Sequence, residues 1–406
     1  MRASRLWCSC VLVLAASLAG KGSTSGTTER DSAGVTIVEN LVSQTATPTW
    51  HLSDTPTVEI GLVEGAEPYL LHRVTASYVL DDGRIVVANS GTAELRFFDA
   101  QGTYLGATEG RGQGPGELRG IGQVVRLPGD TLINVDPGEG RLDRFDSEGR
   151  YIDRSRFSFR HLFNRPFFAE NAELLPDGSL LILLFESERE TPTGLSRARL
   201  GRIRLNLATT EQDTIGWFGA AENYTIEVGG RRLPGSAPFG RHTVITWSDR
   251  YIYVGDTDRY EVSCYTIDGS LVRLIRRDAD PVPVTDQDIA DHRALYREFM
   301  KQNPDRAELL RRWLDAVPYP ATKPSFTRLM TDRLENLWVA EPRPAAEDAV
   351  PWSVFTAEGQ FLSRIGLPQN FTPKDIGPNY VLGVWRDELE VEFVRRHEIV
   401  RSKGKE

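Results

Sequence analysis

Cysteine is scarce in this chain, and its scarcity limits how the fold can be held together. Of 406 residues three are cysteine, and Cys8 and Cys10 lie in an apolar run close to the N-terminus. That run follows two arginines and precedes small and polar residues, which is the layout of a secretory signal peptide over residues 1–20. Its removal leaves Cys264 as the one cysteine, so an intramolecular disulfide is excluded. The sequence therefore predicts an exported protein with a large ordinary hydrophobic core.

A lipid anchor is the alternative to free export. The order Leu18, Ala19, Gly20 is the one that precedes the lipid-bearing cysteine of bacterial lipoproteins, but Lys21 follows it here. Because a lysine has no thiol, the thioether to lipid cannot form at this position. We expect cleavage after Ala19 or Gly20, a location in the periplasm, at the cell envelope or outside the cell, and an N-terminal segment over residues 21–49.

Positive charge is also in deficit. The chain carries 48 lysines and arginines against 57 aspartates and glutamates, and loss of two leader arginines changes the formal net charge from −9 to −11. A surface of this sign repels nucleic acid and anionic lipid unless a local basic patch intervenes. We therefore expect no nucleic-acid partner, and the mature sequence predicts no transmembrane segment.

What the chain does contain is a repeat of alternating strands and tight turns. The stretch from Tyr78, YVLDDGRIVVANSGTAELRFFDAQGTYLG, matches the stretch from Val124, VVRLPGDTLINVDPGEGRLDRFDSEGRYID, in the order of its strands and turns. The first turns of the six units fall near Gly83, Gly129, Gly178, Arg250, Asn336 and Asp387. Four-stranded units at this spacing predict an all-β, six-bladed β-propeller, with a β-sandwich of hairpins as the alternative.

The last unit ends after its third strand, so one strand is missing from the count. TPTVEIG, residues 55–61, has the alternation of that fourth strand. We predict that this N-terminal strand closes the last blade, which protects the sheet edges. The propeller then covers residues 50–406.

A segment of different character interrupts the repeat at about residues 283–323. Two stretches, TDQDIADHRALYREFMKQ and NPDRAELLRRWLDAV, carry apolar residues at helical spacing, and Thr285 with Asp288 predicts a helix cap. The sequence predicts a helical hairpin inserted between the fourth and fifth blades. Its apolar faces either pack on each other and on the propeller, or form a cap over the channel or a docking surface for a partner.

The glycine-rich stretch GRGQGPGEL, residues 110–118, lies between the first two blades. No lysine and hydroxyl residue follow Gly116, the glycine spacing is not that of a dinucleotide fingerprint, and no helix follows. We interpret it as a structural connector, with a ligand loop as the alternative.

The whole mature chain resembles the exported bacterial six-bladed β-propellers that are related to the NHL-repeat group. The resemblance rests on RDSAGVTIVEN after the leader, on GRGQGPGEL, and on GVWRDELEVEFVRRHEI near the C-terminus. Many of those proteins are lipoproteins without an assigned activity. The resemblance implies the fold and an exported location, whereas Lys21 departs from the lipoprotein pattern.

Candidate binding residues precede the first turn of several blades, where the strands that line a propeller channel begin. They are His72, Arg73, Arg241, His242 and Arg328. Arginines at this place suit a carboxylate or phosphate, since a guanidinium donates two parallel hydrogen bonds to such groups. The alternative is that the arginines pair with acidic neighbours and merely fill the channel. We predict a binding or scaffold protein for a small molecule or an envelope protein, without a cofactor.

An enzyme is the competing class. The chain contains no serine nucleophile elbow, no HExxH pair and no calcium loop of alternating carboxylates. Metal-dependent lactonases of related shape hold a calcium-like ion in the channel with oxygen ligands, for which Glu170 and Asn379 are the right residue types. This alternative predicts a hydrolase or lyase with a divalent cation.

Overall fold

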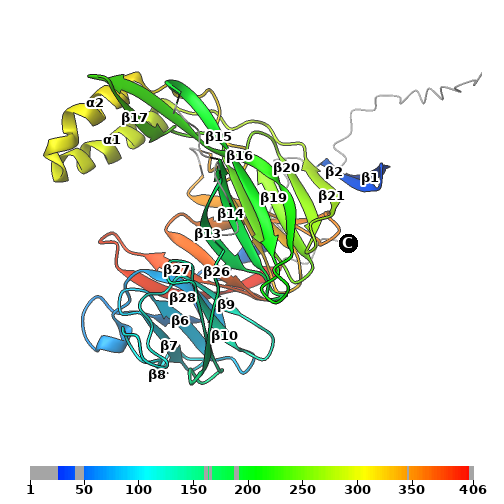
Figure 1. Cartoon of the computed structure of the whole chain (residues 1–406), viewed down its shortest axis with the longest axis vertical. Coiled ribbons are helices and arrows are strands. Elements are labelled where there is room, and N and C mark those ends of the chain that lie inside the picture. The colour runs from blue at the N-terminus through cyan, green and yellow to red at the C-terminus, as the bar shows by residue number, and fades with distance from the viewer. Residues whose placement is uncertain are drawn as a thin grey trace, which may run out of the picture.

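The computed structural model describes residues 26–41, 50–159, 163, 167–186, 192–344 and 347–401. Within these ranges the chain forms six β-sheets of four to six strands, which are the blades of a propeller (Figure 1). The predicted leader and Lys21 lie outside the described residues. Among the helices that the described ranges contain, none has the length and apolar character needed to cross a membrane.

The first two blades are plain repeats of four antiparallel strands. Blade 1 contains β5 (Val74–Val79), β6 (Ile85–Asn89), β7 (Glu94–Phe98) and β8 (Tyr104–Ala107), after a short 3-10 turn, η1 (Glu67–Tyr69). Blade 2 contains β9 (Gln123–Arg126), β10 (Leu132–Asp136), β11 (Arg141–Phe145) and β12 (Tyr151–Arg156). The predicted turns at Gly83 and Gly129 have φ of +90° and +76°, which a residue without Cβ adopts readily.

The third and fourth blades are enlarged. Blade 3 contains β13 (Phe167–Leu174), β14 (Leu180–Glu186), β15 (Gly194–Leu205), β16 (Gln212–Val228) and β17 (Arg231–Ser236). Blade 4 contains β18 (Thr243–Trp247), β19 (Tyr251–Asp256), β20 (Glu261–Thr266), β21 (Leu271–Arg277), and the N-terminal hairpin β1 (Gly26–Ser32) and β2 (Val35–Leu41). Because β2 pairs in parallel with β21, this part of the predicted N-terminal segment is an outer layer of blade 4.

The last two blades bring the chain back to its start. Blade 5 contains β22 (Arg328–Thr331), β23 (Leu337–Ala340), β24 (Ala349–Phe355) and β25 (Phe361–Pro368). Blade 6 contains β26 (Phe371–Ile376), β27 (Tyr380–Arg386) and β28 (Glu392–Arg401). Both β3 (Trp50–Leu52) and β4 (Val58–Ile60) pair with β28, so the predicted closure of the last blade by residues 55–61 is confirmed, with β3 as an additional partner.

The core is divided among the gaps between blades. Six clusters of buried apolar residues each contain side chains from two neighbouring blades, and the cluster of blades 6 and 1 includes Val58, Ile60, Phe98 and Leu382. A strand that packs on both sides is apolar at successive positions, as in β6, where the four residues before Asn89 are apolar and buried. The cluster between blades 6 and 1 joins the final blade to the first, so the ring is closed.

The register predicted for blade 6 was wrong in one respect. The sequence pattern placed its first turn near Asp387, with the strand from Tyr380 as its first strand. In the structure β26 is the first strand, and the turn at Asp387 connects the second strand to the third. This shift moves Asn379 from the start of a channel strand to the turn after one.

The helical insertion lies between β21 and β22 in the chain. Helix α1 (Asp286–Gln302) begins at Thr285, whose side chain and that of Asp288 form the predicted reciprocal cap. A 3-10 turn, η3 (Pro304–Arg306), leads into α2 (Ala307–Ala316). The helices lie against the projecting part of blade 3, at the end of the molecule far from blade 1 (Figure 1).

One tryptophan anchors this insertion. Trp313 is 2 % exposed, and its Nε1 donates a hydrogen bond to the Tyr224 carbonyl at 2.8 Å. Its ring also stacks on Tyr296 of α1, with ring centroids 5.7 Å apart. Tyr296, Trp313 and Val317 therefore pack between the helices and on blade 3, whereas Phe299 of α1 and Leu309 of α2 remain 44 % and 39 % exposed.

The glycine-rich connector is held by a single arginine. Arg154 donates hydrogen bonds to the carbonyls of Gln113, Gly114 and Glu117 at 3.0 to 3.1 Å, while its Nε donates to buried Asp143 at 2.6 Å. Glu117 in turn accepts from the Gly114 N–H at 2.7 Å. The stretch is a folded connector whose backbone is hydrogen-bonded to Arg154 of blade 2, as expected of a structural turn.

Candidate functional site

The first strand of every blade lines a central channel, and a cavity of about 450 Å³ opens there. All six blades contribute to its wall, through residues of β5, β9, β18, β22 and β26 and through Pro176 after β13. Its lining includes the whole of β9, from Gln123 to Arg126. We call this space the channel cavity, and the end at which the first strands terminate its lower mouth.

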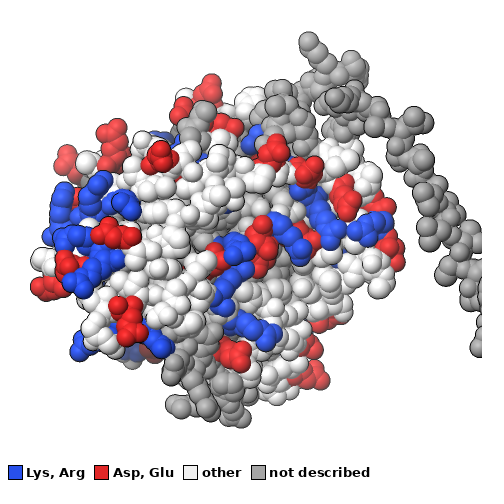
Figure 2. Space-filling model, turned by 90° about the horizontal axis from the view of Figure 1, so that it is seen from above, with Lys and Arg blue, Asp and Glu red and all other residues white. Residues whose placement is uncertain are grey.

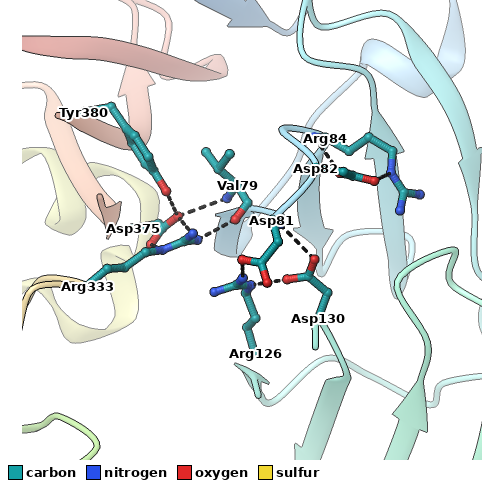
Figure 3. A network of polar contacts seen from close by, with 9 residues as sticks. All are labelled: Val79, Asp81, Asp82, Arg84, Arg126, Asp130, Arg333, Asp375 and Tyr380. Atoms are coloured by element: carbon teal, nitrogen blue, oxygen red, sulfur yellow. Dashed lines mark hydrogen bonds and ion pairs between the residues drawn. The ribbon is translucent and has the colours of Figure 1, made fainter. Parts of the chain in front are cut away.

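A network of ion pairs closes the ring at the lower mouth (Figure 3). Asp375 accepts two hydrogen bonds from Arg333, at 3.1 and 2.7 Å, and others from the Val79 N–H at 3.0 Å and the Tyr380 hydroxyl at 2.9 Å. The Arg333 guanidinium also donates to the Val79 carbonyl. We call these four residues the seam, because they join blades 5, 6 and 1.

A second ion-pair group continues this network to blade 2. Arg126 donates to Asp130 at 2.5 Å and also contacts Asp81, and Asp130 accepts from the Asp81 N–H at 2.8 Å. Burial, followed by the Asp375 charge, raises the pKa of the neighbouring Tyr78 well above its usual range, and its hydroxyl donates to the Val124 carbonyl at 2.7 Å. The arginines of the lower mouth are thus neutralised by carboxylates.

Two other basic side chains of the channel are not neutralised in this way. Lys374 of β26 donates to the Thr75 carbonyl at 3.0 Å, and Arg328 of β22 donates to the Pro373 carbonyl at 3.2 Å. Among the residues that the structure describes, no carboxylate lies within ion-pair distance of either group. Both are half-buried. We call Arg328 and Lys374 the channel cation pair.

The electrostatics of the channel cation pair follow from burial and from like charge. Burial, and after it the Arg328 charge, lowers the pKa of Lys374 to about 8. Among the described residues the attraction opposing this is that of Glu392, which is itself paired with Arg386 at 2.7 Å. Burial also lowers the pKa of the Arg328 guanidinium below its usual value. Lys374, which lines the channel cavity, and Arg328, which does not, are thus two neighbouring cations without an ionic partner in the described part of the chain.

Backbone bulges place Lys374 in the channel. The pairing of β26 with β27 passes from Pro373 to Asp375, which leaves Lys374 as the extra residue. The pairing of β5 with β6 likewise skips Thr75, whose carbonyl receives the Lys374 ammonium. A bulge redirects a side chain and frees a backbone group from the ladder. Two bulges on neighbouring strands thus bring the ammonium and the carbonyl together.

The five predicted binding residues are placed differently from one another. Arg241 and His242 precede β18, and His72 and Arg73 precede β5, which belong to blades 4 and 1 on opposite sides of the ring. Arg241 forms an ion pair with Glu222 at 2.6 Å, so it is neutralised, as the alternative from the sequence held. Within the described ranges no hydrogen bond or ion pair joins any two of the five.

His72 and His242 have structural backbone contacts. The His72 N–H donates to Asn89 at 2.8 Å, and the His242 N–H donates to Thr257 at 3.0 Å. The His242 ring lies 3.3 Å from the Gly240 carbonyl through Nδ1. Arg73 has a positive φ of 58°, and its carbonyl accepts from the Ser90 N–H. Of the five predicted residues, Arg328 is the one that belongs to the channel cation pair.

The two candidate metal ligands lie toward opposite ends of the channel strands. Glu170 is the extra residue of a bulge in the first half of β13, and its side chain lies outside what the structure describes. Asn379 follows the end of β26, and its carbonyl accepts from the Ile399 N–H at 2.8 Å. In the described part of the chain, no group of three or more histidine, cysteine, aspartate or glutamate residues is arranged to hold a metal ion.

Cys264 is not a candidate for chemistry. The thiol is fully buried, and burial raises its pKa to about 12. A thiol in this state is protonated at neutral pH and a poor nucleophile. This agrees with the interpretation of Cys264 as a core residue.

Lys374 was missed in the sequence because its strand was missed. The bulge interrupts the alternation of FTPKDI, so the next regular run, from Tyr380, was counted as the first strand. The sequence did contain a signal for this strand. The fifth unit already completes four strands by Pro368, so a strand after it must open blade 6.

No protein-family model and no curated protein sequence matches this chain. Solved structures with a similar fold include an exported protein from Bacteroides fragilis, at 11 % identity and a TM-score of 0.47, with 90 % of this chain and all of that chain covered. A member of the DUF4221 family from Bacteroides vulgatus is 12 % identical, with a TM-score of 0.48 and coverage of 87 % and 99 %. At these values the likeness carries no inference about activity.

A propeller enzyme appears among the similar structures as well. The virginiamycin B lyase from Staphylococcus aureus, in an inactive form with quinupristin, is 10 % identical, with a TM-score of 0.38 and coverage of 86 % of this chain and 100 % of that chain. The class of this protein, a six-bladed β-propeller, follows from its own sheets and core clusters.

Proposed function

We propose that this protein is an exported β-propeller that binds a small organic anion in its central channel, with Arg328 and Lys374 as the groups that hold the anion. The observation that carries the proposal is Lys374, which lines a cavity of about 450 Å³ without a carboxylate partner among the described residues, together with the likewise unpaired Arg328 of the neighbouring blade, which is not itself among the lining residues. Export is the prediction from the leader over residues 1–20.

The energetic argument starts from the cost of burying charge. A half-buried cation without an ionic partner destabilises the folded state, and a second cation nearby adds repulsion. An anion between Arg328 and Lys374 removes both costs. The guanidinium donates paired hydrogen bonds to a carboxylate or phosphate, and the ammonium adds a point charge.

The other arginines named along the channel are already paired with carboxylates. Arg333 and Arg126 are neutralised by Asp375 and by Asp130 with Asp81, and at the other end of the channel Arg241 is neutralised by Glu222. An anion that bound these arginines would have to displace a carboxylate already in place. The channel cation pair offers its charge without such competition.

The overall surface fits a small ligand better than a polyanion. In Figure 2 basic and acidic side chains lie next to one another over the visible face. With a net charge of −9 for the chain, long-range attraction of nucleic acid is not expected. The positive charge that the proposal needs is local and lies within the channel.

The experiment compares two probes that differ in charge, hexanoate and hexanol, by calorimetric titration at pH 7. We expect hexanoate to bind at least about tenfold more tightly than hexanol, the size of one charged hydrogen bond or more. Arg328→Gln and Lys374→Met should each remove the difference, while Arg241→Gln should retain it. Equal binding of both probes to the native protein, or no binding of hexanoate, would contradict the proposal.

A further inference from the structure

Lysine is rare in this chain, and one of its few lysines lines the channel cavity. Of the 48 lysines and arginines six are lysine, and three of these, Lys301, Lys323 and Lys374, lie within the described ranges. Lys374 belongs to the lining of the cavity of about 450 Å³. The residue type matters at this position, because a lysine can lose its proton and become a nucleophilic amine, whereas an arginine stays charged.

The three described lysines differ in their partners. The ammonium groups of Lys301 and Lys323 pair with Glu298 and Asp288, each at 2.8 Å. In the described part of the chain Lys374 has no carboxylate within ion-pair distance. A carboxylate partner stabilises the charged form of a lysine. Of the three, Lys374 is therefore the one that most readily gives up its proton.

The charged groups that act on Lys374 favour its neutral form. They are Arg328, Arg386 and Glu392, so two cations oppose one carboxylate, and that carboxylate is paired with Arg386 at 2.7 Å. Burial, and after it the Arg328 charge, lowers the pKa of Lys374 to about 8. At pH 7 about one-tenth of such amines are neutral, roughly 300-fold more than at the ordinary pKa of 10.5. A desolvated lysine beside another cation is one of the ways in which proteins activate an amine.

The backbone holds the amine in place without using its lone pair. Lys374 is the extra residue of the bulge in β26, and its Nζ donates to the carbonyl of Thr75, which the bulge in β5 takes out of the strand pairing. An ammonium carries three N–H groups, and the neutral amine carries two with a lone pair. The bond to Thr75 needs one N–H and persists in both forms. The lone pair of the neutral amine is therefore left for a ligand in the cavity.

We infer that Lys374 is a nucleophile that forms an imine with a small aldehyde or ketone in the channel cavity. The nitrogen lone pair attacks the carbonyl carbon and forms a C–N bond, while the electron pair of the C–O π bond moves to the oxygen, which takes one proton from the nitrogen. The resulting hydroxyl leaves as water with the second amine proton, and the nitrogen completes a C=N bond. The step needs neither an oxidant nor a reductant. It goes beyond the proposed function, in which the charged form of the same residue holds an anion, and does not depend on it.

Reductive trapping of the imine tests the inference. Hexanal and sodium cyanoborohydride are added to the full chain at pH 7, and the peptides that contain lysine are followed by mass spectrometry. Reduction converts an imine to a secondary amine, so a modified lysine gains the mass of hexanal less one oxygen atom. We expect modification of Lys374 to be at least about tenfold faster than that of Lys301, since its larger neutral fraction outweighs the lower nucleophilicity of a less basic amine. Equal rates at the two lysines would overturn the inference.

Variants show whether the site activates the amine. Arg328→Gln removes the neighbouring positive charge, so the pKa of Lys374 should rise and its modification should slow by about threefold or more. Arg241→Gln, at the other end of the channel, should leave the rate unchanged. Thermal melts verify that both variants fold. A rate at Lys374 that is the same in Arg328→Gln as in the native protein would contradict activation by the site.

Hexanoate separates this inference from the proposed function. An anion held by Lys374 and Arg328 should protect Lys374 from hexanal and leave the modification of Lys301 unchanged. Fast modification of Lys374 that hexanoate does not slow would support the imine and contradict the anion site. Binding of hexanoate without preferential modification of Lys374 would support the anion site and overturn the imine.

Discussion

Two groups of basic side chains line the same channel, and they differ in whether their charge is matched. At the lower mouth Arg333 is bonded to Asp375, which also accepts from the Val79 N–H and the Tyr380 hydroxyl. Deeper on the same strands, Arg328 and Lys374 donate to backbone carbonyls. The comparison indicates that the seam joins blades 5, 6 and 1 where the ring closes, whereas the channel cation pair is the group that an external anion neutralises under the proposed function.

The largest expected effect comes from breaking the matched group. Asp375→Ala leaves Arg333, the Val79 N–H and the Tyr380 hydroxyl without their common acceptor, all at the point where the ring closes. Loss of one partner of a buried pair costs about 3–5 kcal/mol. We expect a decrease of this size in the free energy of unfolding measured in urea.

A neighbouring carboxylate provides the control for that experiment. Asp249 also lines the channel cavity but is exposed. Asp249→Ala should change the free energy of unfolding by less than about 0.5 kcal/mol. Equal losses for both variants would mean that the seam has no special part in closing the ring.

The next largest effect is expected in the pH dependence of anion binding, because Lys374 loses its charge near pH 8 and the paired arginines do not. The pKa of Lys374 is lowered to about 8, so the ammonium that holds the anion is lost as the pH rises through that value. Binding of hexanoate should weaken by up to about tenfold between pH 7 and pH 9. Lys374→Arg keeps its charge over this range, so its binding should stay constant, and a parallel decline in that variant would exclude Lys374 as the titrating group.

The free energy of unfolding should also depend on the protonation of Lys374, and it should rise as this group loses its proton. The folded-state pKa of Lys374, about 8, lies below its ordinary value of 10.5, so the unfolded chain binds more protons between those values. Below pH 8 the charged Lys374 therefore destabilises the folded state to its full extent. This destabilisation decreases as the pH rises above 8 and disappears near 10.5. Lys374→Met should raise the free energy of unfolding at pH 7 by about 1–2 kcal/mol, after allowance for solvent screening.

Lys374→Met should therefore increase the stability of the protein and reduce its binding of the anion. We expect Lys374→Met to melt at a higher temperature than the native protein and to lose the ligand-induced rise in melting temperature that mass action gives. Scanning calorimetry with and without hexanoate measures both. A variant that melts at a lower temperature would show that Lys374 stabilises the fold, contrary to its assignment as an unmatched charge.

The smallest effect is expected at the other end of the channel. Arg241 is exposed and paired with Glu222, and pairs of this kind are worth less than about 1 kcal/mol. Arg241→Gln should lower stability by no more than that and leave hexanoate binding unchanged. A marked loss of binding would move the site to the residues first expected from the sequence.

The fold was predictable because its signals are local. The strands of a blade alternate apolar and polar residues and are separated by tight turns, which are patterns within a short stretch of sequence. The cap of α1 likewise depends on Thr285 and Asp288, which are three residues apart. The strand at residues 55–61 was identified because a ring with a missing strand needs one. The parallel attachment of β2 to β21 has no such signal, since it depends on pairing between distant segments.

The candidate site was only partly predictable, because its contacts are distant in sequence. Arg328 was identified from its place at the start of a channel strand, but Lys374 meets Thr75 across 299 positions of the chain. The bulge that directs Lys374 inward also hides β26 from a search for alternation. Arg241 precedes a first strand, where a ligand-binding residue was expected, and only the structure shows that Glu222 neutralises its charge.

The most direct test of the account is a crystal structure with 6-bromohexanoate, in which anomalous scattering locates the bromine and the density locates the carboxylate. The account predicts the carboxylate within hydrogen-bonding distance of both Arg328 and Lys374. A carboxylate bound elsewhere, with no density for the compound between these two side chains, would contradict the central claim that the channel cation pair is an anion site.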